Sequence, residues 1–135
     1  MDVRKNVLTP QDFIMLYQAV GWEAPNEAQV AVALKHSLCN FVCYQGEQAV
    51  GMVRLLGDRG MSFYLKDMAI LPKWQGKGCG KALLQSVCAW IEENIAAEYP
   101  VSLELLSSPG ADAFYQACGF SCWQGKGMIR MLKRS

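Results

Sequence analysis

Three closely spaced glycines, Gly76, Gly78 and Gly80, are the residues of this chain best suited to hold a small ligand. They follow an apolar run and precede a long stretch of helical periodicity, so a tight turn between a strand and a helix is expected. Glycine permits the positive φ values that let successive N–H groups converge, and it has no Cβ to keep a ligand away. The first N–H groups of the following helix, and the positive end of its dipole, point to the same place. The turn is therefore predicted to bind an anion, and a phosphate is the expected one.

Two common phosphate-binding motifs do not fit this turn. A P-loop reads G-x-x-x-x-G-K-[ST], and its first glycine would fall on Gln75 and its hydroxyl residue on Ala82. Magnesium would then lack a Ser or Thr ligand, which disfavours nucleotide hydrolysis. A dinucleotide fingerprint reads G-x-G-x-x-G, and its third glycine would be Lys81 or Leu83, depending on where the motif starts.

The pattern that fits is Gln75-x-x-Gly78-x-Gly80, which resembles the Q/R-x-x-G-x-G/A signature of the GNAT superfamily of N-acetyltransferases. A later segment, Phe114-Tyr115-Gln116-Ala117-Cys118-Gly119-Phe120, resembles the F-Y-x-x-x-G-F of the same family. The resemblance covers nearly the whole chain. It implies that the acetyl group of acetyl-CoA moves to a primary amine of a small molecule or peptide, by direct attack in a ternary complex. The alternative is a regulatory module that binds acyl-CoA without turnover.

The resemblance also implies where coenzyme A binds. The pyrophosphate is expected on the N–H groups of the glycine turn, and the pantetheine arm along the open edge of a strand that splays from its neighbour. The side chains of Lys77 and Lys81 either assist or are ordinary exposed charges. Ser108 stands where many relatives have an asparagine that contacts the coenzyme. The expected coenzyme-binding residues are Met68, Ala69, Ile70, Gln75, Gly76, Lys77, Gly78, Cys79, Gly80, Lys81, Ser108 and Tyr115.

Tyr115 is the expected general acid, because the resemblance places it near the departing sulfur. A thiol and a phenol, with reference pKa values of about 8.5 and about 10, are close enough for this proton transfer. The alternative for Tyr115 is a core tyrosine on a short amphipathic helix. The sequence does not decide which base takes the proton of the amine. The candidates are Asp67, Tyr64, Glu104 and a water relay. Asp67 is named as base or as structural anchor.

The acceptor site is expected to be built by the first two helices and the loop at Gly21 and Trp22, with the final hairpin closing its other side. Trp22 either contacts the amine or simply packs. Tyr64 is a second candidate contact. Strict alternation along the strand places Tyr64, Lys66, Met68 and Ile70 on one face of the sheet and Asp67 on the other. A bulge in this strand would reverse that assignment locally.

Residue patterns predict an α/β (α+β) protein with one domain over residues 1–135. Helices are expected over residues 10–20, 26–38, 78–97 and 109–118, about four in all. Strands are expected over residues 3–7, 40–44, 48–56, 61–71, 101–106, 120–123 and 128–132. They would form a mixed, mostly antiparallel sheet of about six to seven strands, with 61–71 and 101–106 as a central, splayed, parallel pair.

Composition argues for a cytoplasmic globular protein. Thirteen basic and twelve acidic residues give a net charge of +1, so neither nucleic acid nor a membrane is an expected partner. No signal peptide or apolar run of about eighteen residues is visible. Exposed edge strands make a homodimer plausible. With one histidine and no C-x-x-C pair, no metal site is expected.

The six cysteines are expected to be reduced, mostly buried, small hydrophobic residues. Cys79 is the one to watch, because a thiol at a helix N-terminus tends toward the thiolate. A packing role is the favoured interpretation, since the family usually has an aliphatic residue there.

Overall fold

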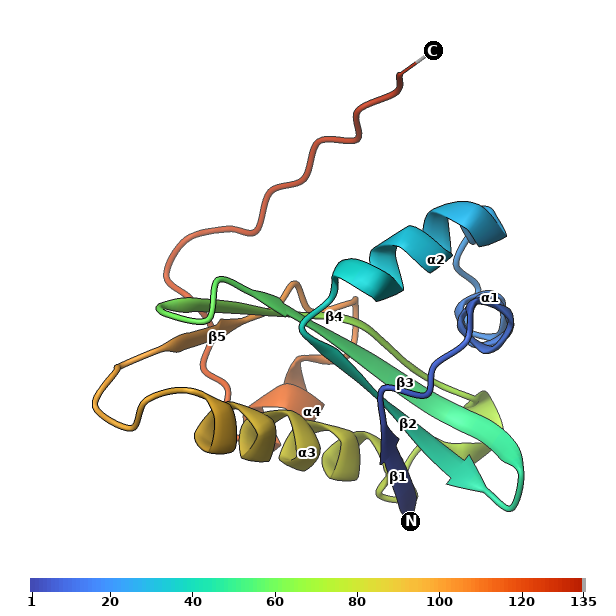
Figure 1. Cartoon of the computed structure of the whole chain (residues 1–135), viewed down its shortest axis with the longest axis horizontal. Helices are drawn as coiled ribbons and strands as arrows, with labels where there is room; N and C mark the ends of the chain where they lie inside the picture. The colour runs from blue at the N-terminus through green and yellow to red at the C-terminus, as the bar shows by residue number, and fades with distance from the viewer. Residues whose placement is uncertain (135) are drawn as a thin grey trace. The chain divides into compact units, whose positions relative to one another are not determined.

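The structure, a computed structural model, describes residues 1–134. The chain forms two compact units, Met1–Leu105 and Leu106–Ser135. The first unit holds a five-stranded sheet and three helices (Figure 1). The strands are β1 (Asp2–Lys5), β2 (Cys39–Gln45), β3 (Gln48–Gly57), β4 (Ser62–Ile70) and β5 (Ser102–Glu104). The helices are α1 (Pro10–Ala19), α2 (Glu27–His36) and α3 (Cys79–Asn94), and the second unit holds α4 (Asp112–Ala117).

Side-chain caps begin the first two helices as the sequence predicts. The Thr9 hydroxyl accepts a hydrogen bond from the N–H of Asp12 at 3.1 Å, and Pro10 occupies the first turn of α1. The side chain of Asn26 accepts one from the N–H of Gln29 at 2.8 Å at the start of α2. Each cap satisfies an N–H group that has no partner within the helix.

The sheet follows the order of the chain, β1-β2-β3-β4-β5. The first four strands pair antiparallel, and β4 pairs parallel with β5 through the crossover that contains α3. Parallel neighbours need a connection of this length, whereas β2 and β3 need only a hairpin turn.

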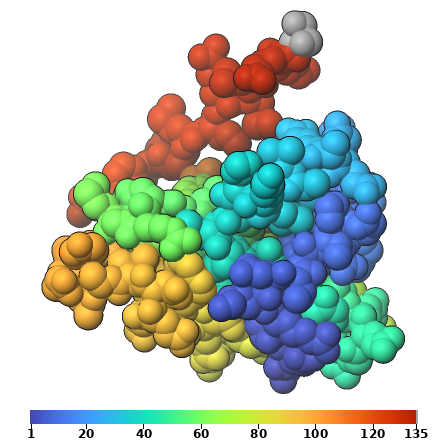
Figure 2. Space-filling model, viewed as in Figure 1, coloured from blue at the N-terminus to red at the C-terminus, as the bar shows by residue number. Residues whose placement is uncertain are grey.

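Helices cover both faces of the sheet. Met52 of β3 belongs to a core cluster with Phe13 and Leu16 of α1. A Cβ at the preceding residue, Gly51, would lie 2.5 Å from the Sγ of Cys79, at the start of α3. Because successive residues of a strand face opposite sides, α1 and α3 lie on opposite faces (Figure 1). Helices α1 and α2, blue to cyan in Figure 2, lie side by side on the first of these faces.

The second unit ends α4 in a Schellman motif. The N–H of Phe120 donates to the carbonyl of Tyr115 at 3.0 Å, and the N–H of Gly119 donates to that of Gln116 at 3.1 Å. Gly119 has a φ of 96°, which a side chain would strain. The rings of Phe120 and Tyr115 then meet with centroids 5.7 Å apart. Tyr115, Gly119 and Phe120 therefore all take part in the hydrogen bonds and ring contact that end α4.

The prediction of six to seven strands is wrong, because the sheet has five. Within residues 1–134, neither 120–123 nor 128–132 joins a ladder, and β5 is only three residues long. The parallel pair therefore lies at an edge of the sheet and not at its centre. An alternating apolar pattern makes a segment able to pair, but a strand forms only where a partner edge is in register.

No helix among residues 1–134 is both long and apolar enough to cross a bilayer. Three of the six cysteines, Cys39, Cys43 and Cys79, are buried. The cytoplasmic location and the single domain over residues 1–135 stay predictions.

Candidate active site

The glycine turn joins the end of β4 to the start of α3. After Leu71, a short 3₁₀ turn, η1 (Pro72–Trp74), leads to Gly76 and Gly78, whose φ values are 75° and 92°. A Cβ at either glycine would meet no atom within 4 Å, so the space beside the backbone is open. The glycines are required for their left-handed conformation and not because a neighbour crowds them.

The start of α3 has no side-chain cap. Gly78 is the N-cap residue, so it offers no oxygen to the first N–H groups of the helix. These groups come from the buried Cys79, the partly buried Gly80 and the exposed Lys81. Lys77, also exposed, places its Nζ 5.1 Å from the centroid of the Trp74 ring. The turn therefore presents unpaired donors and positive charge to an anion.

Gln75 ties this turn to the strand before it. Its side-chain amide nitrogen donates to the carbonyl oxygen of Ile70 at 3.0 Å. The motif glutamine therefore has a local structural role, which spacing alone did not reveal.

The thiol of Cys79 packs inside the protein. It is 1% exposed, and burial, followed by its contact with the Cys43 thiol, raises its pKa well above the ordinary range. This side chain is therefore a neutral thiol at neutral pH, and the packing interpretation is confirmed. The helix N-terminus does not activate it, because desolvation disfavours the thiolate more strongly.

One edge of β4 lacks a strand partner near the glycine turn. Within residues 1–134, the ladder between β4 and β5 pairs only 62–64 with 102–104 and ends at Tyr64 and Glu104. The N–H of Leu71 donates to Val50 of β3 at 2.8 Å. Because backbone groups alternate between the two edges of a strand, the N–H and carbonyl of Ile70 face away from β3. The Ile70 carbonyl accepts a hydrogen bond from the side chain of Gln75, and the Ile70 N–H is directed to the open edge.

A bulge in β4 lies beside this open edge. Met52 pairs with Ala69 and Arg54 pairs with Lys66, so two residues of β4, Asp67 and Met68, lie opposite Val53 alone. Asp67 has a φ of 59°, an uncommon value for a residue with a side chain. The arrangement is that of a bulge whose first residue is left-handed, a position that glycine often occupies.

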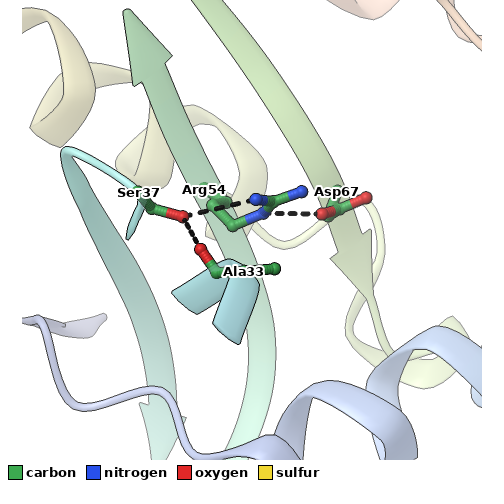
Figure 3. Close-up of polar contacts among 4 residues, drawn as sticks. All are labelled: Ala33, Ser37, Arg54 and Asp67. Carbon is green, nitrogen blue, oxygen red and sulfur yellow. Dashed lines mark hydrogen bonds and ion pairs between the residues drawn. The ribbon is translucent and has the colours of Figure 1, made fainter. Parts of the chain in front are cut away.

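The bulged residue is held by an ion pair (Figure 3). The Nε of Arg54 lies 2.9 Å from Oδ2 of Asp67, and the two side chains are only 13% and 6% exposed. The other end of the Arg54 guanidinium donates to the hydroxyl of Ser37 at 3.3 Å, and that hydroxyl donates to the carbonyl of Ala33 at 2.7 Å. The bulge is thereby connected to the C-terminal end of α2.

Strict alternation in β4 ends at the bulge, which reverses the faces locally as the sequence allowed. Residues paired across antiparallel strands share a face, so Ala69 shares the face of Met52, whereas Ile70 shares the opposite face with Gly51. Tyr64 and Lys66 pair with Leu56 and Arg54 and lie on the face that α1 and α2 cover. The carboxylate of Asp67 meets Arg54 on this same face.

The aromatic side chain of Tyr17 lies near this ion pair, and Trp22 packs against Tyr17. The pKa of Tyr17 is raised, first by burial and then by the charge of Asp67, while Arg54 opposes the shift. The ring of Trp22, in the connection after α1, meets that of Tyr17 with centroids 4.9 Å apart. Trp22 and Asp67 are predicted from the sequence, whereas Tyr17 and Arg54 are not. Tyr17 lies within the helical periodicity of α1 and belongs to no motif, and no spacing rule links Arg54 with Asp67.

Tyr115 and Ser108 belong to the second unit. The ring of Tyr115 contacts those of Phe114 and Phe120, and burial, followed by the nearby Cys118, raises the pKa of its hydroxyl. The phenol is therefore protonated at neutral pH. Ser108 is exposed, and its carbonyl accepts from the N–H of Ala111 at 3.0 Å.

The model of the family described as "Acetyltransferase (GNAT) domain" matches residues 36–122. The chain belongs to the GNAT family. The match runs from the end of α2 past α4, so it includes the bulge, the glycine turn and the Schellman motif.

Individual GNAT proteins support the assignment. An uncharacterized N-acetyltransferase ycf52-like from Prochlorococcus marinus is 32% identical in an alignment of 110 residues that covers 78% of this chain and 59% of that protein. The chain thus spans about three fifths of that curated relative's length. A GNAT family acetyltransferase from Streptococcus pneumoniae is 29% identical, with a TM-score of 0.78 over 98% of each chain. A probable acetyltransferase from Staphylococcus aureus, 23% identical, shares the fold with a TM-score of 0.87 over 97% of this chain and 98% of its own.

Proposed function

We propose that this chain is an N-acetyltransferase that moves the acetyl group of acetyl-CoA directly to a primary amine of a small molecule or peptide. One observation carries the proposal beyond family membership. The unpaired edge of β4 leads into a glycine turn with open space at Gly76 and Gly78 and an uncapped helix start. An extended chain with a diphosphate at one end fits such a surface, because a strand edge and a set of convergent N–H groups recognise those two parts.

In this proposal, backbone groups hold the coenzyme. The N–H groups of Gly76 to Lys81 bind the pyrophosphate, and the side chains of Lys77 and Lys81 add positive charge at the rim. Met68, Ala69 and Ile70 supply main-chain groups to the pantetheine arm. Ser108 contributes a weaker contact than an asparagine would, because a hydroxyl has fewer hydrogen-bonding groups than an amide.

The N–H of Ile70 is the proposed donor to the thioester oxygen. It faces the open edge, whereas the Ile70 carbonyl is already bound by Gln75. A prealigned donor at a developing oxyanion contributes about 2.7–4 kcal/mol to the transition state. The Gln75 contact supports this role because it restrains the peptide groups next to the donor.

Tyr115 is the proposed general acid, which gives its proton to the departing sulfur. Its raised pKa keeps the phenol protonated until negative charge develops on the thiolate. Asp67 is proposed as a structural anchor and not as the base, because its carboxylate is bound by Arg54. Glu104 already accepts from the hydroxyl of Ser102 at 2.7 Å. A water relay to solvent is therefore the proposed path for the amine proton.

The amine is proposed to bind on the face covered by α1 and α2, near Trp22 and Tyr64. The rings of Tyr17 and Trp22, which meet with centroids 4.9 Å apart, supply an apolar contact for the carbon next to the nitrogen.

An amine panel assayed by release of free coenzyme A thiol tests the proposal. A parallel thermal titration with acetyl-CoA should raise the Tm, because a ligand that binds only the native state stabilises it. A raised Tm without turnover on any amine would favour the regulatory acyl-CoA module. No change in Tm at millimolar acetyl-CoA would contradict coenzyme binding itself.

Two matched variants separate an anchor from a base at Asp67. Asp67→Asn tolerates the positive φ but cannot accept a proton, and Arg54→Met breaks the same ion pair while leaving the carboxylate. If Asp67 is an anchor, both variants change kcat/KM alike. A much lower kcat in Asp67→Asn alone would identify Asp67 as the base.

A further inference from the structure

Two basic residues stand opposite each other in the sheet, next to the bulge. Arg54 of β3 pairs directly with Lys66 of β4 in the antiparallel ladder. Like charges placed directly opposite each other on neighbouring strands destabilise a sheet. The bulge brings one carboxylate, that of Asp67, to this pair of cations. Among these three groups, one positive charge is therefore not neutralised.

Asp67 neutralises Arg54 and not Lys66. The Nε of Arg54 lies 2.9 Å from Oδ2 of Asp67, and another nitrogen of the same guanidinium donates to Ser37 (Figure 3). Lys66 is partly buried, and it forms no ion pair with any of the residues 1–134. Charges that are partly removed from water are normally paired in folded proteins. The ammonium group of Lys66 is therefore available to a charged group of a ligand.

Glu104 is the other acidic residue on this face of β4 and β5. It pairs with Tyr64 in the parallel ladder, two residues before Lys66. Glu104 is exposed, and its carboxylate accepts a hydrogen bond from the hydroxyl of Ser102 at 2.7 Å. An exposed carboxylate contributes little to an ion pair, because water and salt screen its charge. Glu104 therefore does not replace a ligand at Lys66.

Lys66 lies where a side chain can contact the acceptor. It shares the face of Tyr64 and of the Asp67 carboxylate, the face on which the amine is proposed to bind. Ile70, whose N–H is the proposed donor to the thioester oxygen, follows four residues later. The backbones of these two residues are at most about 14 Å apart, and the long, flexible stem of lysine shortens the remaining gap. Lys66 can therefore reach the far end of a small acceptor whose amine lies at the thioester.

We propose that Lys66 makes the site selective for amines that carry a second, negatively charged group, a carboxylate or a phosphate. The ammonium of Lys66 pairs with this group, while Tyr17 and Trp22 contact the apolar carbons between the two ends of the acceptor. The inference rests on the proposed function, and it narrows the acceptor to amino acids and related anionic amines. Diamines and polyamines are poor acceptors in this account, because their second cation meets Lys66.

Three acceptors of equal length test the selectivity. 4-Aminobutyrate, butylamine and 1,4-diaminobutane carry a negative, a neutral and a positive group at the far end. With release of coenzyme A thiol as the readout, kcat/KM for 4-aminobutyrate should exceed that for butylamine by about tenfold, as expected for one charge-assisted contact. The value for 1,4-diaminobutane should be the lowest. Glycine and 6-aminohexanoate vary the spacing, phenylalanine with phenylethylamine adds a ring, and O-phosphoethanolamine replaces the carboxylate with a phosphate.

Variants of Lys66 test the residue itself. Lys66→Met should remove the preference, mainly by raising KM for 4-aminobutyrate, because the ion pair is present before and during the reaction. Lys66→Glu should reverse it, so that 1,4-diaminobutane becomes the best of the three acceptors. This variant should not lower the Tm, since glutamate opposite Arg54 replaces a pair of like charges by a favourable pair. Lys5→Met, at an exposed residue of β1, removes the same charge elsewhere and should keep the order of wild type.

The outcomes separate this inference from the proposed function. Equal kcat/KM for acidic and neutral acceptors throughout the series would overturn the selectivity and leave acetyl transfer standing. An order of acceptors that Lys66→Glu leaves unchanged would do the same. If none of the amines releases coenzyme A thiol, the proposed function fails, and the selectivity fails with it.

Discussion

Arg54 on β3 holds Asp67 on β4 by an ion pair of 2.9 Å, at the single point of β4 where the backbone adopts a φ of 59°. The pair connects the bulge with α2 through the hydroxyl of Ser37. The left-handed backbone and the interrupted pairing are both unfavourable, so they persist only because the surroundings stabilise them. The pair is the contact best placed to do so.

Replacing Arg54 by methionine should lower the free energy of unfolding by about 3–5 kcal/mol, because a nearly buried carboxylate is left without its partner. Urea denaturation measures this loss. The double variant Arg54→Met/Asp67→Asn should recover part of it, since asparagine removes the charge and tolerates the backbone.

The surface pair of Arg4 with Asp2 supplies the control. It is even shorter, 2.7 Å, but both side chains are 51% exposed. Arg4→Met should therefore cost much less stability than Arg54→Met. Equal losses at Arg4 and Arg54 would mean that burial does not strengthen the inner pair.

Gly78→Ala should weaken acetyl-CoA binding through the backbone. The change places a Cβ at a φ of 92°, which strains the turn by about 1–2 kcal/mol although nothing crowds the new atom. Gly46→Ala, in the turn between β2 and β3, imposes a similar strain at a φ of 61° and also meets no atom. Both variants should lose similar stability by thermal unfolding, but only Gly78→Ala should raise the Kd for acetyl-CoA in calorimetry.

Tyr115→Phe should lower kcat by about 10²- to 10⁴-fold, which is the usual contribution of a general acid. The stability should hold, because phenylalanine keeps the ring contact with Phe120. Steady-state kinetics with an amine substrate measure the effect, and Tyr99→Phe, at a side chain that is 52% exposed, is the control. An unchanged kcat would remove the acid role and leave the fold assignment intact.

Stability at low pH should depend on Asp58. Its carboxylate accepts hydrogen bonds from the N–H groups of Ser62, Met61 and Gly60, which lower its pKa from 3.8 to about 2. The folded pKa lies below the unfolded one, so the stabilisation is present above about pH 4 and is lost as the pH falls toward 2. The Tm of wild type and Asp58→Asn should therefore differ at pH 6 and converge near pH 2, while Glu47→Gln should follow wild type throughout.

Local patterns were sufficient for the elements whose cause is local. The Thr9 and Asn26 caps and the positive φ of Gly78 each depend on residues within a few positions of one another. The glycine turn and the segment 114–120 also carried the family resemblance. A short pattern predicts these features because the chain itself brings the atoms together.

Features that depend on residues far apart in the chain could not be predicted from short patterns. The bulge at Asp67 changes which face Ile70 occupies, and it is held by Arg54, thirteen residues earlier in the chain. The segments 120–123 and 128–132 alternate like strands but join no ladder within residues 1–134.

The sequence by itself therefore determined the family, the glycine turn and the helix ends, because those depend on residue type and short spacing. Only the tertiary structure decided that Asp67 is paired with Arg54 and that the sheet has five strands. Each of these depends on which distant groups share a low-dielectric interior or a strand edge, and such proximity is a property of the folded chain.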